Sequence, residues 1–241
     1  AHRRFGRIPW ADLFPPAVQL AEDGFRISPR LEKSIERAKA RGLTAFDASR
    51  RYFFTSAGTP RPAGSLLRNP DFARTLRQLA KQGIDAFYHG DIGRAVVDAV
   101  RNSPRNPGSL TRADLARYRT IERTPVCIDY RQHRVCGMGP PSSGGLTVGQ
   151  ILGILSRFDL AQIGYGEKSL HLFAEAAKLA YADRDLYMAD HDFSPVPVAG
   201  LLNSKYLDQR ADLIKANAVL KKASAGHPPG AVLGHLIPGQ Q

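Results

Sequence analysis

The chain has 241 residues, of which 43% are hydrophobic and 23% are charged. This composition is ordinary for a globular protein, and the length suffices for one large domain or two small ones. No run approaches the roughly 18 apolar residues of a membrane-spanning helix. The two cysteines are too few for a disulfide-dense mini-protein or a four-cysteine zinc site. No apolar run follows the basic first residues, so they are not a signal peptide, and the missing initial Met leads us to expect that upstream sequence has been removed.

The formal net charge is +12, from 34 Lys and Arg against 22 Asp and Glu. Such a balance can indicate a nucleic-acid or anionic-membrane partner. Here the basic residues are scattered, and acidic residues such as Glu32 and Glu36 are interleaved with them. No basic block studded with aromatic residues is present. We therefore expect a solvated, Arg-rich surface and no nucleic-acid partner.

The first hundred residues carry the start and stop signals of helices. Ser28 and Asn69 each precede a proline, which places a capping side chain before a Pro in the first helical position. Gly24 and Gly83 follow apolar stripes, where glycine commonly ends a helix. These signals predict helices over residues 11–23, 29–41, 70–82 and 91–102.

The pattern changes in the second half of the chain. Thr111 and Asp114 form a capping-box pattern before a short helix that ends near Tyr118. Residues 122–138 alternate around Arg131 and Gln132, which predicts a β-hairpin. Apolar residues at helical spacing then predict three helices, one directly after Gly145 and two over residues 168–190 and 204–214. The first two helices are expected to face the core with Val148, Ile151, Leu152, Leu155 and Phe158, and with Leu170, Phe173, Ala177, Tyr181 and Met188.

The predicted hairpin brings the two cysteines together. If Arg131 and Gln132 form a two-residue turn, Tyr130 pairs with His133 and Cys127 pairs with Cys136. The cysteines then form a non-hydrogen-bonded pair, in which side chains approach most closely. A disulfide and two free thiols both remain open at this point.

Residues 216–241 differ from the rest of the chain. They show no sustained periodicity and are rich in Lys, Ala, Gly and Pro. Such composition is typical of a segment that packs little. We therefore expect a core domain over residues 1–215 and a tail over 216–241 that is mobile or loosely held in the processed form.

The most suggestive short motif is PPSSGG at residues 140–145, which lies directly before a predicted helix. The free amides at that helix end could hold a carboxylate or an oxyanion. The simpler interpretation, which we favour, is a helix cap made by Ser142 or Ser143. The motif is not the G-x-S-x-G elbow of serine hydrolases, and no base is evident beside it.

Two further groups could in principle bind a metal. His171 and Glu175 share a helix face at i, i+4 spacing, but H-E-x-x-H is absent, so a surface pair is favoured. The sequence around Asp183, Asp185, Asp190 and Asp192 lacks the central Gly and closing Glu of a calcium loop. Structural hydrogen bonds or ion pairs are favoured for Asp183 and Arg184.

Taken in order, the motifs give a more specific result than any one alone. The chain resembles the γ-glutamyltransferase (γ-glutamyl transpeptidase) family over nearly its whole length. The matching segments are PWADLFPPA at 9–17, LAEDGF at 20–25, GIDAFYHG at 83–90, LT at 110–111 with DLARY at 114–118, RTP at 123–125, PPSSGG at 140–145, EAAK at 175–178, YADR at 181–184 and VPV at 196–198.

The resemblance implies an α/β fold, namely the helix-rich large-subunit part of a four-layer αββα N-terminal-nucleophile hydrolase. Such a precursor cuts itself before a threonine, which then attacks a γ-glutamyl amide such as glutathione. Water or an amino acid resolves the γ-glutamyl-enzyme. The family's usual export to the periplasm or the medium would permit a disulfide.

No catalytic residue can be transferred to this chain. The family's nucleophilic Thr opens a Thr-Thr-His-like motif that is absent here, and its substrate-binding Arg is expected upstream of Ala1. We assign no catalytic, cofactor-binding or metal-binding residue and expect no cofactor. We expect the chain alone to be inactive and its partner to be the small subunit of the same precursor. The alternatives are a cephalosporin-acylase-like or polyglutamate-processing relative, or a non-catalytic scaffold on the same fold.

Overall fold

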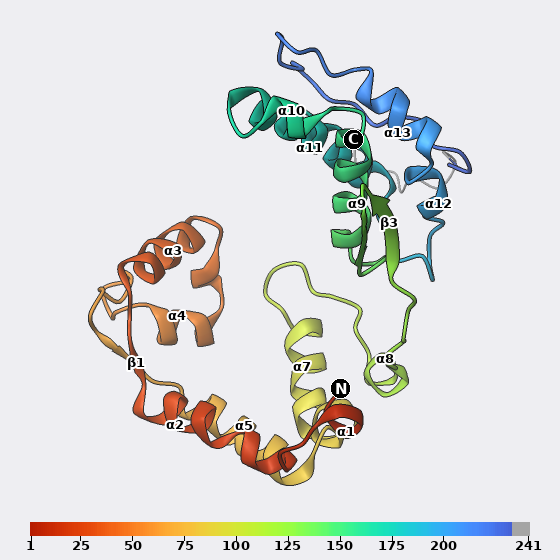
Figure 1. The fold of residues 1–241 in the computed structure, drawn as a ribbon. Coiled ribbons are helices and arrows are strands. Elements are labelled where there is room, and N and C mark those ends of the chain that lie inside the picture. The colour runs from red at the N-terminus through yellow and green to blue at the C-terminus, as the bar shows by residue number, and fades with distance from the viewer. Residues whose placement is uncertain (233–241) are drawn as a thin grey trace. The chain divides into compact units, whose positions relative to one another are not determined.

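A computed structural model describes residues 1–232 and divides the chain into two compact units, at residues 120 and 121 (Figure 1). This boundary differs from the one expected after residue 215. The regular elements of the first unit are mostly helices, and the second unit combines helices with a hairpin. Within residues 1–232, no helix is long and apolar enough to cross a membrane.

The first unit consists of short helices and one two-stranded pairing. The helices are α1 (His2–Phe5), α2 (Pro15–Asp23), α3 (Pro29–Ala40), α4 (Asp47–Phe53), α5 (Pro70–Gln82), α6 (Asp85–Tyr88), α7 (Asp91–Arg101) and α8 (Arg112–Arg117). The 3₁₀ turns η1 (Trp10–Leu13) and η2 (Leu43–Ala45) and the antiparallel strands β1 (Phe25–Arg26) and β2 (Leu66–Leu67) complete it.

The predicted helix over residues 11–23 is divided in two. The 3₁₀ turn η1 ends at Leu13, and α2 begins at Pro15. Pro15 and Pro16 have no N–H to donate to an earlier turn, so a continuous helix cannot pass through them. Proline is tolerated only in the first turn, and this is where α2 places it.

The predicted caps of the first unit are confirmed. The side chain of Ser28 accepts a hydrogen bond from Leu31 N at 3.1 Å, and that of Asn69 accepts one from Phe72 N at 2.9 Å. Thr111 and Asp114 form the reciprocal capping box. These bonds satisfy amides that have no partner inside the helix, so they fix where each helix starts.

Over residues 121–232, the second unit contains the hairpin β3 (Val126–Tyr130) and β4 (His133–Gly137) and five helices. The helices are α9 (Gly144–Leu155), α10 (Leu160–Ile163), α11 (Glu167–Tyr187), α12 (Val198–Leu201) and α13 (Ser204–Ala211). Helix α9 packs against the hairpin, α11 and α13.

The predicted register of the hairpin is confirmed. Tyr130 pairs with His133 and Cys127 with Cys136, and the two cysteines are joined in a disulfide with Cα atoms 4.1 Å apart. Arg131 has a φ of 56°, the positive value that a tight two-residue turn requires despite the unfavourable residue type. Of the two states left open by the sequence, the structure contains the bonded one.

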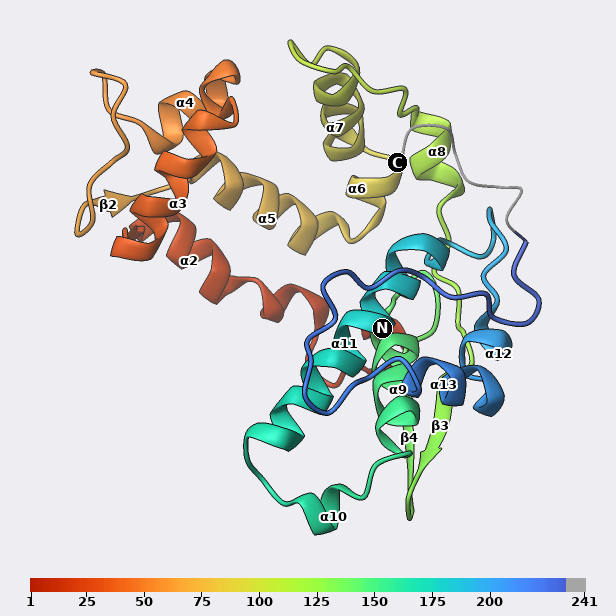
Figure 2. The same ribbon diagram turned by 90° about the horizontal axis from the view of Figure 1, so that it is seen from above.

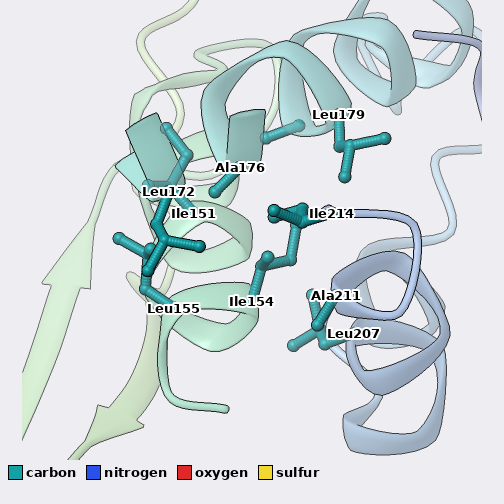
Figure 3. Packing of buried hydrophobic residues seen from close by; sticks show 10 residues of the cluster. Ile151, Ile154, Leu155, Leu172, Ala176, Leu179, Leu207, Ala211 and Ile214 are labelled. Carbon is teal, nitrogen blue, oxygen red and sulfur yellow. The ribbon is translucent and has the colours of Figure 1, made fainter. Parts of the chain in front are cut away.

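The core of the second unit is formed where α9, α11 and α13 meet (Figure 3). Ile154 of α9 and Leu179 of α11 are fully buried there, with Leu207 of α13 beside them. A Cβ at Gly153 would overlap Leu207 Cδ1. The absence of a side chain at Gly153 therefore allows α9 and α13 to approach closely.

The core face predicted for α11 is wrong in part. Leu170, Phe173 and Tyr181 are exposed, and the buried apolar residues are Leu172, Ala176, Leu179, Ala180 and Tyr187. Helix α11 has apolar residues on two sides, so periodicity alone favoured the side with the larger ones. Small side chains let a helix approach its neighbour closely, and the alanine side is the one that meets α9. Val148 of α9, also expected in the core, is exposed.

Residues 216–232 contain no helix or strand, but they are held by side chains of the second unit. The segment follows α13 and runs back along α11 (Figure 2). Its bonds to Glu175, Asp183 and Arg210 are described below. The part of the expected mobile tail that covers residues 233–241 lies outside the described residues.

Candidate functional site

The PPSSGG motif forms a tight turn between β4 and α9. Ser143 occupies the N-cap position of α9 but makes no side-chain cap bond, whereas Ser142 Oγ accepts a 3.4 Å hydrogen bond from Gly144 N, the first amide of the helix. Gly145 N donates to the carbonyl of Met138 at 3.1 Å. A Cβ on Gly145 would lie 2.6 Å from that carbonyl oxygen, so only glycine allows the turn to fold back on β4.

Ser143 is held by α11 instead. Arg184 Nε donates a 3.0 Å hydrogen bond to Ser143 Oγ, and the same guanidinium pairs with Asp185 at 2.8 Å. The partners of the two serine hydroxyls are thus a backbone amide and a guanidinium, neither of which can accept a proton from a serine nucleophile. The turn therefore has the contacts of a structural connection between β4, α9 and α11.

A pocket of about 400 Å³ lies beside this turn, lined in part by Pro140 and Val196. Its main charged group is Arg123, which donates to both carboxylate oxygens of Asp192 at 3.1 and 2.5 Å and to His191 Nε2 at 2.9 Å. The hydrogen bond from Arg123 holds the pKa of Asp192 below its usual value. Asp192 neutralises the guanidinium of Arg123. The contacts of Arg123 join the loop after α11 to the segment that leads into β3.

The pair His171 and Glu175 does not form the surface pair that the spacing suggested. Glu175 is 1% exposed and accepts from Lys178 Nζ at 2.7 Å and from Leu220 N at 2.8 Å. Burial opposes its ionisation, but the bonds from Lys178 and Leu220 N outweigh it, so its pKa is lowered. His171 Nε2 donates to the carbonyl of Lys215 at 2.8 Å. Both side chains therefore face the segment after α13.

Asp183 is the centre of a buried polar network. Its side chain has no solvent exposure. Oδ2 accepts from Gln150 Nε2 at 2.8 Å and from the Tyr206 hydroxyl at 2.7 Å. Oδ1 accepts from Gly226 N at 2.9 Å and lies 3.1 Å from Arg210 Nη2. Three hydrogen-bond donors and one positive charge therefore compensate a fully buried carboxylate, as such a group requires.

Asp183 and Arg184 make structural bonds, as expected, and the other aspartates of this group are bonded too. Asp183 pairs with Arg210, Asp185 with Arg184, and Asp192 with Arg123. Within residues 1–232, no three His, Cys, Asp or Glu side chains are grouped so that they could hold a metal ion.

The buried cluster of Gln150, Asp183 and Arg210 was not predicted from the sequence. One signal was present, because Glu175 and Asp183 lie on the same face of α11 as Leu172, Ala176 and Leu179. A carboxylate on a buried face requires partners, but periodicity does not identify them. Gln150 and Arg210 lie 33 and 27 positions away from Asp183, and only the tertiary fold brings them together.

The chain is similar to known enzymes over nearly all its length. The family model for gamma-glutamyltranspeptidase matches residues 1–232. The glutathione hydrolase proenzyme of Escherichia coli is 36% identical over 228 residues, which are 94% of this chain and 38% of that protein. The acylase ACY 1 proenzyme of Pseudomonas sp. (strain SE83) is 39% identical over 213 residues, which are 88% and 37% of the two chains. This chain thus spans about two fifths of the length of these relatives.

Solved structures agree with this result. The gamma-glutamyltranspeptidase of Helicobacter pylori has a TM-score of 0.80 at 34% identity, over 100% of this chain and 67% of that one. The cephalosporin acylase of Bacillus halodurans has a TM-score of 0.75 at 28% identity, over 89% of this chain and 40% of that one. The fold is therefore the helix-rich part of the α/β N-terminal-nucleophile hydrolase architecture expected from the sequence. On the match of its family model over residues 1–232, the chain belongs to the gamma-glutamyltranspeptidase family.

Proposed function

We propose that this chain is the large-subunit part of a γ-glutamyltransferase or glutathione hydrolase. The observation that carries the proposal is the match of the whole chain to the gamma-glutamyltranspeptidase of Helicobacter pylori at a TM-score of 0.80. The Escherichia coli relative is named a glutathione hydrolase proenzyme, which supports both the substrate class and formation from a precursor.

In this proposal the precursor cuts itself before a threonine that follows the large-subunit part. The net reaction adds one water across the peptide bond and leaves a new carboxylate and a threonine with a free α-amino group. The hydroxyl of that threonine attacks the γ-carbonyl of the substrate, and the C–N bond breaks as the leaving amine takes the proton. Water or an amino-acid amine then attacks the ester and releases the threonine.

The described residues fit a supporting role in this chemistry. The hydroxyls of Ser142 and Ser143 are bonded to Gly144 N and Arg184, and the carboxylates on the buried face of α11 are compensated by neighbouring donors. Amide cleavage needs a nucleophile, a base and an oxyanion hole. We therefore assign none of these roles to this chain and place them in the small subunit, its proposed partner.

A second candidate is an acylase of the same architecture. It is favoured by the 39% identity to the acylase ACY 1 proenzyme and by the structural match to the cephalosporin acylase of Bacillus halodurans. Both candidates share the scaffold and the covalent step, so the substrate decides between them.

We also place the protein in the periplasm or outside the cell. The disulfide between Cys127 and Cys136 supports this location, since disulfides persist in oxidising compartments and are rare in the cytosol.

The test compares two proteins: the chain of residues 1–241, and the same chain within a precursor that includes the upstream and small-subunit segments. Each is assayed with a chromogenic γ-glutamyl anilide and with a cephalosporin side-chain amide. We expect turnover of the anilide only by the self-cleaved precursor, and loss of both cleavage and turnover when the new N-terminal Thr is replaced by Ala. Turnover by residues 1–241 alone would contradict the proposal, and turnover of the cephalosporin amide alone would favour the acylase.

A further inference from the structure

The segment of residues 216–232, called the strap below, is attached to α11 at two points. Glu175 Oε2 accepts from Leu220 N at 2.8 Å, and Asp183 Oδ1 accepts from Gly226 N at 2.9 Å. The two acidic residues are eight positions apart on the helix, which corresponds to roughly 12 Å along its axis. Six residues of extended chain reach up to about 20 Å, so the strap spans the two points without being stretched.

Both attachment points are buried charges. Glu175 is 1% exposed and is paired with Lys178, and Asp183 is fully buried and is paired with Arg210. A hydrogen bond to a charged acceptor is stronger than one between neutral groups. The amides of Leu220 and Gly226 therefore contribute to the solvation of two carboxylates that water does not reach, and their removal would leave each carboxylate short of a donor.

Three more bonds hold the strap near these points. Arg210 Nη2 donates to the carbonyl of Ser224 at 2.8 Å, and the Tyr187 hydroxyl donates to the carbonyl of Gly226 at 2.7 Å. Lys178 Nζ lies 3.4 Å from the carbonyl of Leu220. At residue 226 the strap also passes so close to Tyr206 that a Cβ would lie 2.5 Å from its hydroxyl oxygen.

These bonds define the register of the strap. They bind backbone groups, so they depend on the position of each residue along the chain and little on its type. A slip of one residue would turn a carbonyl or a side chain toward each carboxylate and leave it without its donor. Packed apolar side chains could stabilise a strap as well as a buried charge does, but they would fix its register less strictly.

We propose that Glu175 and Asp183 are positioning residues for self-cleavage, because they fix the register of the strap and thereby the course of the chain toward the cleavage point. The inference rests on the proposed function, in which the precursor cuts itself downstream of the strap. It also predicts that the strap stays bound to α11 after the cut, since none of its anchoring bonds includes the cleaved peptide.

The test uses the whole precursor with Asp183→Asn and Glu175→Gln, which remove the charge but keep the shape. The matched controls are Asp185→Asn and Glu167→Gln, which make the same changes at exposed positions of α11. Amide hydrogen exchange is measured on peptides from residues 216–232. Self-cleavage is followed by gel electrophoresis at a temperature where circular dichroism shows every variant to be folded.

We expect the strap amides to exchange roughly tenfold faster in both variants, since a hydrogen bond to a neutral acceptor is weaker than one to a charged acceptor by about the free energy that corresponds to this factor. Self-cleavage should slow by a similar factor, and the controls should match the parent in both measurements. If Asp183→Asn does not fold, Tyr206→Phe removes one donor from Asp183 and should slow cleavage by a smaller factor.

Three results would overturn the inference. Cleavage at the parental rate in a variant whose strap amides exchange fast would contradict the positioning role. Fast exchange of the strap amides in the parent would contradict the attachment of the strap to α11. A parent that never cleaves would overturn the proposed function and with it the positioning role. The exchange measurement would still decide whether the carboxylates hold the strap.

Discussion

Tyr206 donates a 2.7 Å hydrogen bond from its hydroxyl to Oδ2 of Asp183, whose side chain has no solvent exposure. Tyr206 belongs to α13 and Asp183 to α11, so this bond joins two helices through their polar groups, beside the apolar cluster that contains Leu146 and Leu201. The phenol must keep its proton, because a phenolate beside a buried carboxylate would place two negative charges together.

Stability should therefore fall at alkaline pH. Burial, followed by the hydrogen bond to Asp183, raises the pKa of Tyr206 far above its usual value. Above about pH 10 the unfolded chain releases this proton and the folded chain keeps it, so the free energy of unfolding falls by roughly 1.4 kcal/mol per pH unit. Below pH 10 both states hold the proton and the full contribution is present.

Urea unfolding of the parent and of Tyr206→Phe between pH 9 and about 11 measures this effect. Other groups also titrate in this range, but their contribution is the same in both proteins and cancels in the comparison. The parent should lose stability more steeply than the variant. Tyr187, whose pKa is also raised by burial, remains in both proteins. Parallel curves for the two proteins would show that Tyr206 does not keep its proton through this bond.

The disulfide should stabilise the hairpin. Cys127 and Cys136 are nine positions apart, and closing a loop of this size is worth about 2–3 kcal/mol in the chain-entropy model. Replacing both cysteines by Ala should lower the free energy of unfolding by that amount, and reduction of the parent should do the same. Mass spectrometry of the alkylated protein should show a gain of two hydrogens on reduction. Alkylation of both thiols without a reductant would contradict the bond.

Neighbouring residues of α11 should respond very differently to truncation. Leu172 is buried in the core formed with α9 and α13, and Phe173 is 53% exposed. Leu172→Ala should cost about 2–5 kcal/mol, through lost burial and the cavity that remains. Phe173→Ala should change the stability of the chain of residues 1–241 by less than about 0.5 kcal/mol, as is usual for a surface position. If chemical unfolding showed Phe173→Ala to be the more destabilising of the two variants, the core face expected from periodicity would be the correct one.

Two glycines of α9 form a similar contrast. A Cβ at Gly153 would overlap Leu207 Cδ1 and lie 3.1 Å from Ile128 Cδ1, whereas one at Gly144 would meet only Ser142 Oγ at 3.8 Å. Gly153→Ala should cost about 1–3 kcal/mol by overpacking, after allowing for the better helix propensity of alanine. Gly144→Ala should be neutral or stabilise by up to about 1 kcal/mol. Equal thermal shifts for the two variants would indicate that α9 and α13 are not packed this closely.

Much of the local structure could be predicted from the sequence alone. Ser28, Asn69 and Thr111 cap their helices through bonds that reach only three residues along the chain. Once the two-residue turn is placed, counting outward residue by residue along both strands pairs Cys127 with Cys136. The order of the short motifs also indicated the family, which the match over residues 1–232 confirmed.

Other features were decided only by the tertiary structure. Helix α11 has apolar residues on two sides, and packing against α9 selected the side with Ala176 and Leu179. Asp183 acquired its partners from α9, α13 and the strap, which lie 23 to 43 positions away. Caps and turns depend on neighbours in sequence, whose separation is fixed by backbone geometry. The face that a helix buries and the donors that compensate a buried carboxylate depend on segments whose approach is set by the whole fold.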